Sequence, residues 1–249
     1  MTQQLALITG GSSGIGAAIA EEAHREGYQV ALLDVDAQAV ARTAARWSGA
    51  IGLVCDITDE HAVDAALAQL PRVPDLLVNN AGIVRFEYML DMSVETFRRV
   101  LDVDLTGAFI VSRAVGRGLR AEGRGGAIVN ISSIGGITPS LGTNAYAPAK
   151  GGLAKLTELM ALEWGPLGIR VNTVSPGFID GGMSAAVYAD PRTREIRSNA
   201  VPLRRLGLER DIAQAVMYLA SDKAAYVNGH NLVVDGAIVH SVLSQVPRA

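Results

Sequence analysis

The glycine-rich segment TGGSSGIG at residues 9–16 constrains the fold of this chain more than any other feature. It follows a short apolar run at residues 5–8 and leads directly into a helical pattern at residues 17–25. Glycines in such a turn let backbone N–H groups approach a pyrophosphate, and the start of the helix adds free donors and a favourable dipole. Glycines also serve ordinary tight turns, but between a first strand and a first helix this pattern predicts a dinucleotide-binding loop.

The rest of the chain alternates short apolar runs with longer helical patterns. We predict further strands at residues 30–33, 51–54, 75–78, 127–131, 169–174 and 231–234, and further helices at residues 37–45, 60–70, 94–120, 147–164 and 211–220. The strands are rich in Val, Ile and Leu without polar alternation, which is typical of strands buried on both faces of a parallel sheet. This order predicts an α/β fold: a single Rossmann-type, doubly wound domain over residues 1–249 with a mostly parallel seven-stranded sheet.

Composition narrows the classes of function. The chain has 22 basic and 25 acidic residues, a formal net charge of −3 and no basic stripe, so no nucleic-acid partner is expected. Cys55 is the only cysteine, and the four histidines show no ligand spacing, so we expect no disulfide and no metal. The N-terminus lacks a signal-peptide pattern, and no apolar run reaches the roughly 18 residues that span a membrane. We therefore expect a cytoplasmic protein that does not bind a membrane.

A carboxylate at the end of the second predicted strand indicates which dinucleotide binds. Asp34 lies about 20 residues beyond the glycine-rich loop, where it can accept hydrogen bonds from the adenosine ribose. The same charge would repel a 2′-phosphate, and its neighbours Ser13 and Val35 offer no basic group to hold one. Asp34 could instead cap the next helix. We predict NAD(H) as the cofactor rather than NADP(H).

Tyr146 and Lys150 lie four residues apart at the start of the helical pattern 147–164, which places both on one helix face. A free tyrosine has a pKa of about 10, too high for an efficient base at neutral pH, and a neighbouring ammonium favours the phenolate. Ser133 follows the fifth strand, at the sheet edge where ligands bind, and could orient a substrate carbonyl. Taken singly, such a pair is more often a solvated helix face, and such a serine is more often a loop cap.

In their order along the chain these motifs resemble those of the short-chain dehydrogenase/reductase family. Residues 9–16 resemble its TGxxxGxG loop, residues 79–82 match its NNAG motif, and residues 146–150 match its YxxxK motif. Ser133 precedes Tyr146 by 13 residues, the family's usual spacing, and the resemblance extends over residues 5–235. It implies a cofactor site made of Gly10, Ser12, Ser13, Gly14, Ile15, Gly16, Asp34, Val35, Asp56, Ile57, Asn80, Ala81, Gly82, Tyr146, Lys150, Pro176, Gly177 and Ile179.

The resemblance also implies an activity, that of an NAD-dependent alcohol dehydrogenase or carbonyl reductase acting on a small ketone, secondary alcohol, diol or polyol. Tyr146 would be the acid/base group, Ser133 would polarise the substrate oxygen, and Lys150 would tune Tyr146 and bind the nicotinamide ribose. Three alternatives stay open: a 3-oxoacyl thioester reductase, a non-catalytic NAD-binding sensor, and an epimerase or dehydratase that uses bound NAD transiently. Family members are commonly homotetramers, so we expect one here, with the apolar tail 237–246 buried in a partner or folded over its own subunit.

Three positions depart from the family pattern, the least of them being Ala237, which follows Asp235 and Gly236 where the family usually has a second glycine. Asp104 stands where the family has an asparagine of a proton relay, and we include it among the catalytic candidates. Its carboxylate could draw Lys150 into a tight ion pair and so alter the relay or slow the site, or it could be a tolerated isostere. Gly181 stands where the family often has a threonine that bonds the nicotinamide carboxamide, which leaves that contact to the Ile179 backbone.

The segment 178–207 interrupts the alternation with glycines and prolines, so it is a candidate substrate lid or a plain surface excursion. Its arginines at positions 192, 194 and 197 could meet an anionic substrate or form a solvated helix face. Position relative to the motifs predicts pocket walls made of Val84, Phe86, Ile134, Gly135, Thr138, Asn144, Phe178, Met183 and Val187.

Overall fold

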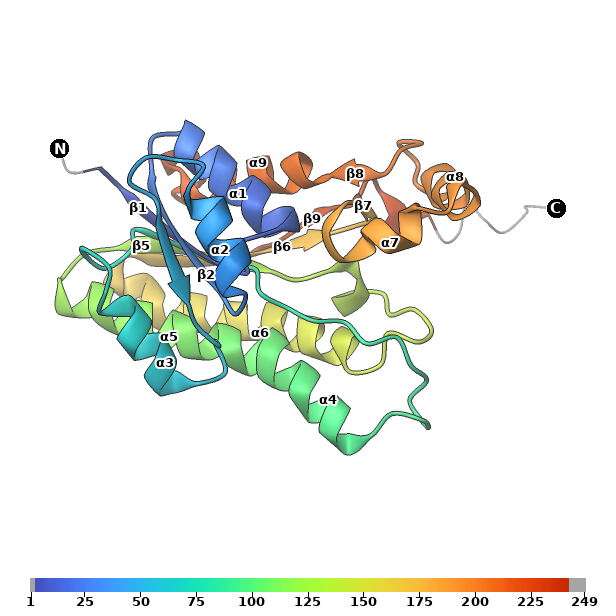
Figure 1. Cartoon of the computed structure of the whole chain (residues 1–249), viewed down its shortest axis with the longest axis horizontal. Helices are drawn as coiled ribbons and strands as arrows, with labels where there is room; N and C mark the ends of the chain where they lie inside the picture. The colour runs from blue at the N-terminus through green and yellow to red at the C-terminus, as the bar shows by residue number, and fades with distance from the viewer. Residues whose placement is uncertain (1–2, 242–249) are drawn as a thin grey trace.

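The seven apolar runs form one parallel sheet at the centre of the protein, in a computed structural model that describes residues 3–241 (Figure 1). Its strands are β1 (Leu5–Thr9), β2 (Gln29–Asp34), β3 (Ile51–Val54), β4 (Leu76–Asn79), β5 (Gly126–Ile131), β6 (Ile169–Pro176) and β9 (Asn231–Val234). They lie in the order β3-β2-β1-β4-β5-β6-β9, and every neighbouring pair is parallel. The prediction of a Rossmann-type sheet is confirmed, and this sheet is parallel throughout.

Helices cover both faces of the sheet, because strands buried on both sides need an apolar layer above and below. One face carries α1 (Gly14–Arg25), α2 (Ala37–Ala44) and α9 (Glu209–Ala220) (Figure 1). The other carries α3 (Glu60–Leu67), α5 (Ala108–Ala121) and α6 (Tyr146–Trp164), and α4 (Val94–Leu101) extends beyond α5 (Figure 1). Ile19 of α1 and Val216 of α9 are fully buried in the first layer, and Val111 of α5 is fully buried in the second.

The predicted helix 94–120 differs from expectation in its middle. A π-helical segment, Asp102–Gly107, joins α4 to α5, so the helical course continues but its side chains are turned locally. Such wide turns are frequent at functional sites. Gly107 packs against Ile57, where an added Cβ would lie 2.7 Å from the Ile57 Cδ1 atom. The π segment buries Asp104, whose residue is 1% exposed.

The segment 178–207 leaves the main sheet after β6 and returns before α9. It contains β7 (Ile179–Asp180), a short 3-10 turn (Gly182–Ser184), α7 (Ala185–Tyr188) and α8 (Pro191–Ala200). β7 pairs in parallel with β8 (Gly207–Leu208), which closes the excursion. The Asp190 side chain caps α8 by accepting from the Arg192 and Thr193 N–H groups. Figure 1 shows α7 and α8 together at one end of the molecule.

The remaining short helices are the 3-10 turns Ile134–Gly136, Gly165–Leu167, Asp222–Ala224 and Ile238–His240. The predicted tail 237–246 lies outside the described residues from position 242 onward. No helix between residues 3 and 241 combines the length and the apolarity needed to cross a bilayer. The same part of the chain holds no group of three or more His, Cys, Asp or Glu side chains placed to bind a metal ion.

Candidate active site

A cavity of about 640 Å³ opens at the carboxyl ends of the strands, where the strand order reverses between β1 and β4. Ligands bind at such switch points because the loops there diverge and leave a crevice. Most of the predicted cofactor and catalytic residues line it: Gly10, Ser13, Gly14, Ile15, Asp34, Val35, Asp56, Ile57, Asn80, Ala81, Gly82, Ser133, Tyr146, Lys150, Pro176, Gly177 and Ile179. Ser12, Gly16 and Asp104 do not line it, but each contacts a residue that does: Ser12 bonds Asp34, Gly16 packs against Gly10, and Asp104 pairs with Lys150.

The glycine-rich loop is shaped for close backbone packing. A Cβ on Gly16 would collide with the Gly10 carbonyl, and a Cβ on Gly10 would lie 2.9 Å from the Ala81 Cα atom. The Asn80 side-chain amide donates to the carbonyls of Thr9 and Gly10 at 3.2 and 3.0 Å, which ties the end of β4 to this loop. The loop conformation therefore depends on glycine at both positions.

Within the described part of the chain, the N-cap side chain leaves the backbone N–H groups in the first turn of α1 without a capping bond. Its N-cap residue Ser13 makes no side-chain capping bond, whereas Asp36 caps α2 and Asp59 caps α3. Uncapped N–H groups at a helix start, facing a cavity, suit an anion. This end of the cavity fits the pyrophosphate of a dinucleotide.

Acidic side chains occupy the end of the cavity beside β2 and β3. The Asp34 Oδ2 atom accepts from the Ser12 hydroxyl and, at 3.3 Å, from the Ser12 N–H. Asp56 accepts from the Thr58 N–H and hydroxyl and pairs with Arg99 at 3.3 Å. Burial acts to raise the pKa of Asp56, but the bonds from Thr58 and Arg99 outweigh it and lower that pKa below its ordinary value. Arg99 is thus engaged with a carboxylate.

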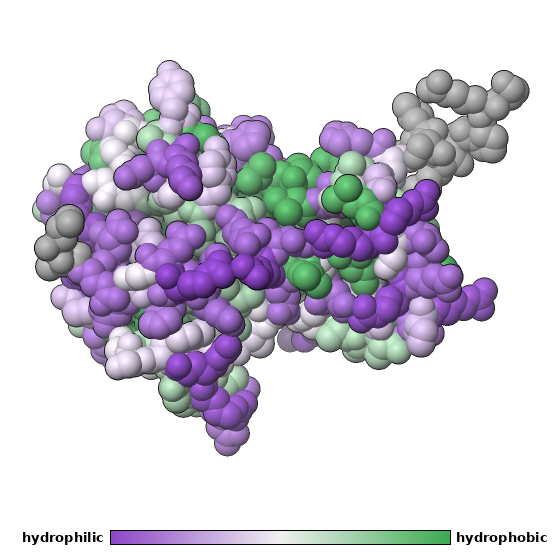
Figure 2. Space-filling model, turned by 90° about the horizontal axis from the view of Figure 1, so that it is seen from above, coloured by the Kyte–Doolittle hydropathy of each residue, from purple (hydrophilic) through white to green (hydrophobic). Residues whose placement is uncertain are grey.

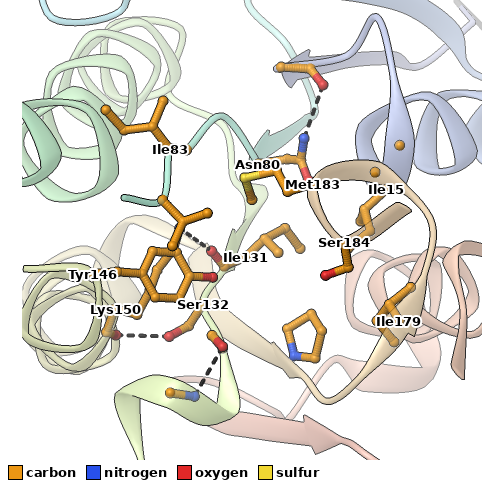
Figure 3. A pocket seen from close by; sticks show the side chains of 18 of the residues that line it. Ile15, Asn80, Ile83, Ile131, Ser132, Tyr146, Lys150, Ile179, Met183 and Ser184 are labelled. Carbon is orange, nitrogen blue, oxygen red and sulfur yellow. Dashed lines mark hydrogen bonds between the residues drawn. The ribbon is translucent and has the colours of Figure 1, made fainter. Parts of the chain in front are cut away.

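Tyr146 and Lys150 enter the cavity from the first turns of α6, with the Lys150 Nζ atom 5.6 Å from the centroid of the Tyr146 ring. Figure 3 shows Tyr146 and Ser132 on one side of the cavity, with Ser184 across from them. The Ser132 hydroxyl donates to the Lys150 carbonyl at 2.8 Å, which ties the end of β5 to α6. Ser133 accepts from the Gly135 N–H at 3.0 Å, which leaves its own hydroxyl hydrogen available for a ligand oxygen.

Asp104 forms a buried pair with Lys150. The Lys150 Nζ atom lies 3.3 Å from the Asp104 Oδ2 atom and donates to the Ile131 carbonyl at 3.0 Å. The Asp104 Oδ1 atom accepts from the Ile83 N–H at 2.7 Å. Burial raises the pKa of Asp104, against the opposing effects of Lys150 and the Ile83 N–H. The pair fits because Gly82 has no side chain: a Cβ there would lie 3.1 Å from the Asp104 Oδ2 atom.

Glu209 does not line the cavity, but it lies directly behind Gly181, a contact that the sequence did not reveal. Gly181 has φ 148° and ψ −175°, and a Cβ on it would collide with the Glu209 carboxylate. The Gly182 N–H bonds the same carboxylate, and burial raises the pKa of Glu209, with Asp180 adding to the effect. In sequence Glu209 is an ordinary acid in the first turn of a helix. Only the fold brings it to the position that a threonine side chain at 181 would need.

The predicted pocket walls are largely right, with two corrections. Seven of the nine predicted wall residues line the cavity, but Asn144 and Val187 do not. The Asn144 side chain is instead buried and donates to the carbonyl of Glu87 at 3.2 Å, which fastens the preceding loop to the start of α6. On α7 the cavity is lined by Tyr188 in place of Val187, because the next position on the helix faces inward.

Comparison with known proteins gives consistent matches over nearly the whole chain. A family model described as enoyl-(acyl carrier protein) reductase matches residues 10–238. The L-rhamnose 1-dehydrogenase (NAD(P)(+)) of Azotobacter vinelandii is 38% identical over 244 residues, covering 93% of this chain and 95% of that protein. The 3-oxoacyl-(acyl-carrier-protein) reductase of Vibrio harveyi is 37% identical over 239 residues, covering 94% and 97%. The crystal structure of a putative gluconate dehydrogenase from Agrobacterium tumefaciens superposes with a TM-score of 0.91 at 31% identity, covering 95% and 96%.

Proposed function

Because the chain belongs to the short-chain dehydrogenase/reductase family, we propose that this oxidoreductase uses NAD(H) to interconvert a secondary alcohol, diol or polyol and the corresponding ketone. The observation that carries the proposal is the convergence of Ser133, Tyr146 and Lys150 on the wall of one cavity whose other end suits a dinucleotide. Relatives named as a sugar dehydrogenase and a putative gluconate dehydrogenase support a hydroxylated substrate.

The side chains divide the chemistry among them. The nicotinamide, when bound, supplies or accepts the hydride. The Tyr146 hydroxyl gives its proton to the carbonyl oxygen during reduction and takes it back during oxidation. The Ser133 hydroxyl donates to the same oxygen and polarises the bond, because its own acceptor lone pair is held by Gly135. The Lys150 ammonium stabilises negative charge on the phenol oxygen. Its one N–H group that is not directed at Asp104 or at the Ile131 carbonyl can hold the ribose.

The preference for NAD rests on Asp34, whose carboxylate lines the cavity at the end of β2. Arg99, the basic residue lining the cavity near this end, is already paired with Asp56. We expect wild-type enzyme to show a higher kcat/KM with NAD than with NADP, and Asp34→Ala to reduce that ratio by about tenfold or more. A higher kcat/KM with the phosphorylated cofactor in the wild type would refute the proposal.

Tyr146→Phe tests the acid/base role. It should lower kcat by about 100- to 10,000-fold while NADH binding, followed by fluorescence, stays near the wild-type value. Tyr226→Phe is the matched control, since Tyr226 is fully exposed and does not line the cavity. Tyr146→Phe activity above about one per cent of wild type would contradict the role.

The substrate panel should include secondary alcohols, diols, sugars and a 3-oxoacyl thioester, because one relative reduces the last class by name. Tight NADH binding with no turnover on the whole panel would favour a binding protein, for which the replacement at Asp104 is the supporting observation.

We propose that the segment 178–207 covers the substrate, since its Met183 and Ser184 line the cavity. A homotetramer and a cytoplasmic location stay predictions; light scattering tests the first and cell fractionation the second.

A further inference from the structure

Helix α8 carries three arginines, and their surroundings in the structure differ. Arg192 is exposed on the outer surface. Arg194 forms a two-pronged pair with Asp180, with N–O distances of 2.6 and 2.8 Å. Arg197 is half-buried and lines the cavity that holds Tyr146. The two outward arginines therefore fit a solvated or paired helix face, and Arg197 needs another explanation.

Two aromatic rings hold the Arg197 side chain in place. Its guanidinium carbon lies 5.0 Å from the centroid of Phe178 and 5.5 Å from the centroid of Tyr188. One N–H group, on the Nη1 atom, bonds the Tyr188 hydroxyl at 3.3 Å. Rings contact the faces of a guanidinium, so they fix its position while its remaining edge donors stay available.

No carboxylate balances this charge within residues 3–241: Arg197 forms none of the ion pairs found there. The other two basic residues lining the cavity are both engaged, Arg99 with Asp56 and Lys150 with Asp104. The acidic residues that line the cavity, Asp34 and Asp56, lie at the dinucleotide end. Among residues 3–241, the substrate end of the cavity thus carries one positive charge, that of Arg197, with no carboxylate paired to it.

The surroundings of Arg197 make an anionic ligand effective. Phe178, Met183, Ile238 and Val239 line the cavity with it, and apolar walls strengthen an ion pair by excluding water. Figure 2 shows apolar surface gathered between the main body of the molecule and the lobe at its right-hand end, whose outer surface is strongly hydrophilic. A guanidinium edge matches the two oxygens of a carboxylate or phosphate.

We propose that the substrate is an anionic hydroxy compound, with a carboxylate or phosphate group bound by Arg197 away from the carbon that is oxidised. This inference rests on the proposed function. In the reaction, hydride leaves the carbinol carbon for the nicotinamide, the hydroxyl proton goes to Tyr146, and a C=O bond forms. The anionic group is unchanged and serves only to hold and orient the substrate.

The test compares aldonic acids and polyol phosphates with the matched uncharged alditols as substrates for wild type, Arg197→Gln and Arg192→Gln. Arg197→Gln should lower kcat/KM for one anionic class by about 10- to 100-fold, mainly through KM, and change that for alditols less than about threefold. Arg192→Gln makes the same charge change on the same helix and should have no effect. Which anionic class responds distinguishes a carboxylate from a phosphate ligand.

Two kinetic results would overturn the inference. One is a wild-type enzyme that turns over the alditols as well as or better than every anionic partner. The other is an equal loss on charged and uncharged substrates in Arg197→Gln, which would mean that the arginine only stacks the segment in place. If no alcohol of either kind is oxidised, the proposed function fails instead. Calorimetry of the acids and phosphates binding to the NAD complex then tests the anion site without turnover. Weaker binding in Arg197→Gln than in wild type supports the site, and unchanged or absent binding refutes it.

Discussion

Replacing Gly181 with alanine should destabilise the protein, even though the family often carries a larger residue there. The backbone at Gly181, with φ 148° and ψ −175°, lies in a region that is essentially restricted to glycine. A Cβ at this position would also strike the Glu209 carboxylate and displace it from the Gly182 N–H. The same movement would disturb the contact between Gly182 and Gly14 of the phosphate loop, because the two backbones touch there.

The magnitude follows from these two effects. The backbone conformation costs about 1–3 kcal/mol in a residue other than glycine. The displaced hydrogen bond to a partly exposed carboxylate adds about 1 kcal/mol. We therefore expect Gly181→Ala to lower the free energy of unfolding by about 2–4 kcal/mol, and to raise KM for NADH. Gly181→Thr should cost more, because a β-branched residue is less tolerant of positive φ.

Urea denaturation of four proteins measures both effects: wild type, Gly181→Ala, Glu209→Ala and the double variant. In the Glu209→Ala background the collision is absent, so Gly181→Ala should cost about 1 kcal/mol less than in wild type. Gly49→Ala is the matched control for positive φ, since Gly49 has φ 78° and nothing within 4 Å of an added Cβ. The reasoning is refuted if Gly181→Ala costs no more than Gly49→Ala, or if Glu209→Ala leaves its cost unchanged.

Three further predictions concern other parts of the molecule. Asp104→Asn should lower the free energy of unfolding by about 3 kcal/mol, because it leaves the buried Lys150 without its counter-charge. It should lower kcat/KM by less than about tenfold. A large loss of activity without destabilisation would instead assign the carboxylate a direct part in proton transfer. Burial raises the pKa of Cys55 from 9.0 to about 11, with Asp56 and Asp59 adding to the effect. At pH 8, native protein should therefore react with a thiol reagent about 100-fold more slowly than unfolded protein. The stability that Cys55 contributes below pH 9 should be lost as the pH rises through about 11. Equal labelling rates, or a Cys55→Ala variant whose free energy of unfolding depends on pH as in wild type, would contradict this. Asn130→Ala should cost about 2–4 kcal/mol in urea denaturation, because it removes the buried partner of Asn79 at 2.7 Å, while kcat/KM of the folded enzyme is kept.

Much of the fold could be predicted from the sequence because its signals are local. Each of the seven strands of the main sheet was predicted within two residues of its observed ends, since an apolar run bounded by turn residues is a property of a few neighbouring positions. The two-residue strands β7 and β8 were not predicted. The glycine-rich loop and the pair Tyr146 and Lys150 are local too, and both lie at the cavity. The π segment at Asp102–Gly107 was missed, because its amino acids are compatible with an ordinary helix; in the fold its Gly107 lies close against Ile57.

The sequence by itself determined the order of the strands and helices of the main sheet and its two covering layers and the position of the dinucleotide loop, and its resemblance to the family pointed to the residues at the candidate catalytic centre. It did so because each of these depends on residue type and spacing over a few turns of chain. Only the tertiary structure decided that Asp104 pairs with Lys150, that Glu209 occupies the space beside Gly181, and that Arg197 alone among the arginines of α8 faces the cavity. Those outcomes depend on distances between segments far apart in the chain and on the direction in which each side chain packs, and neither quantity is encoded in local spacing.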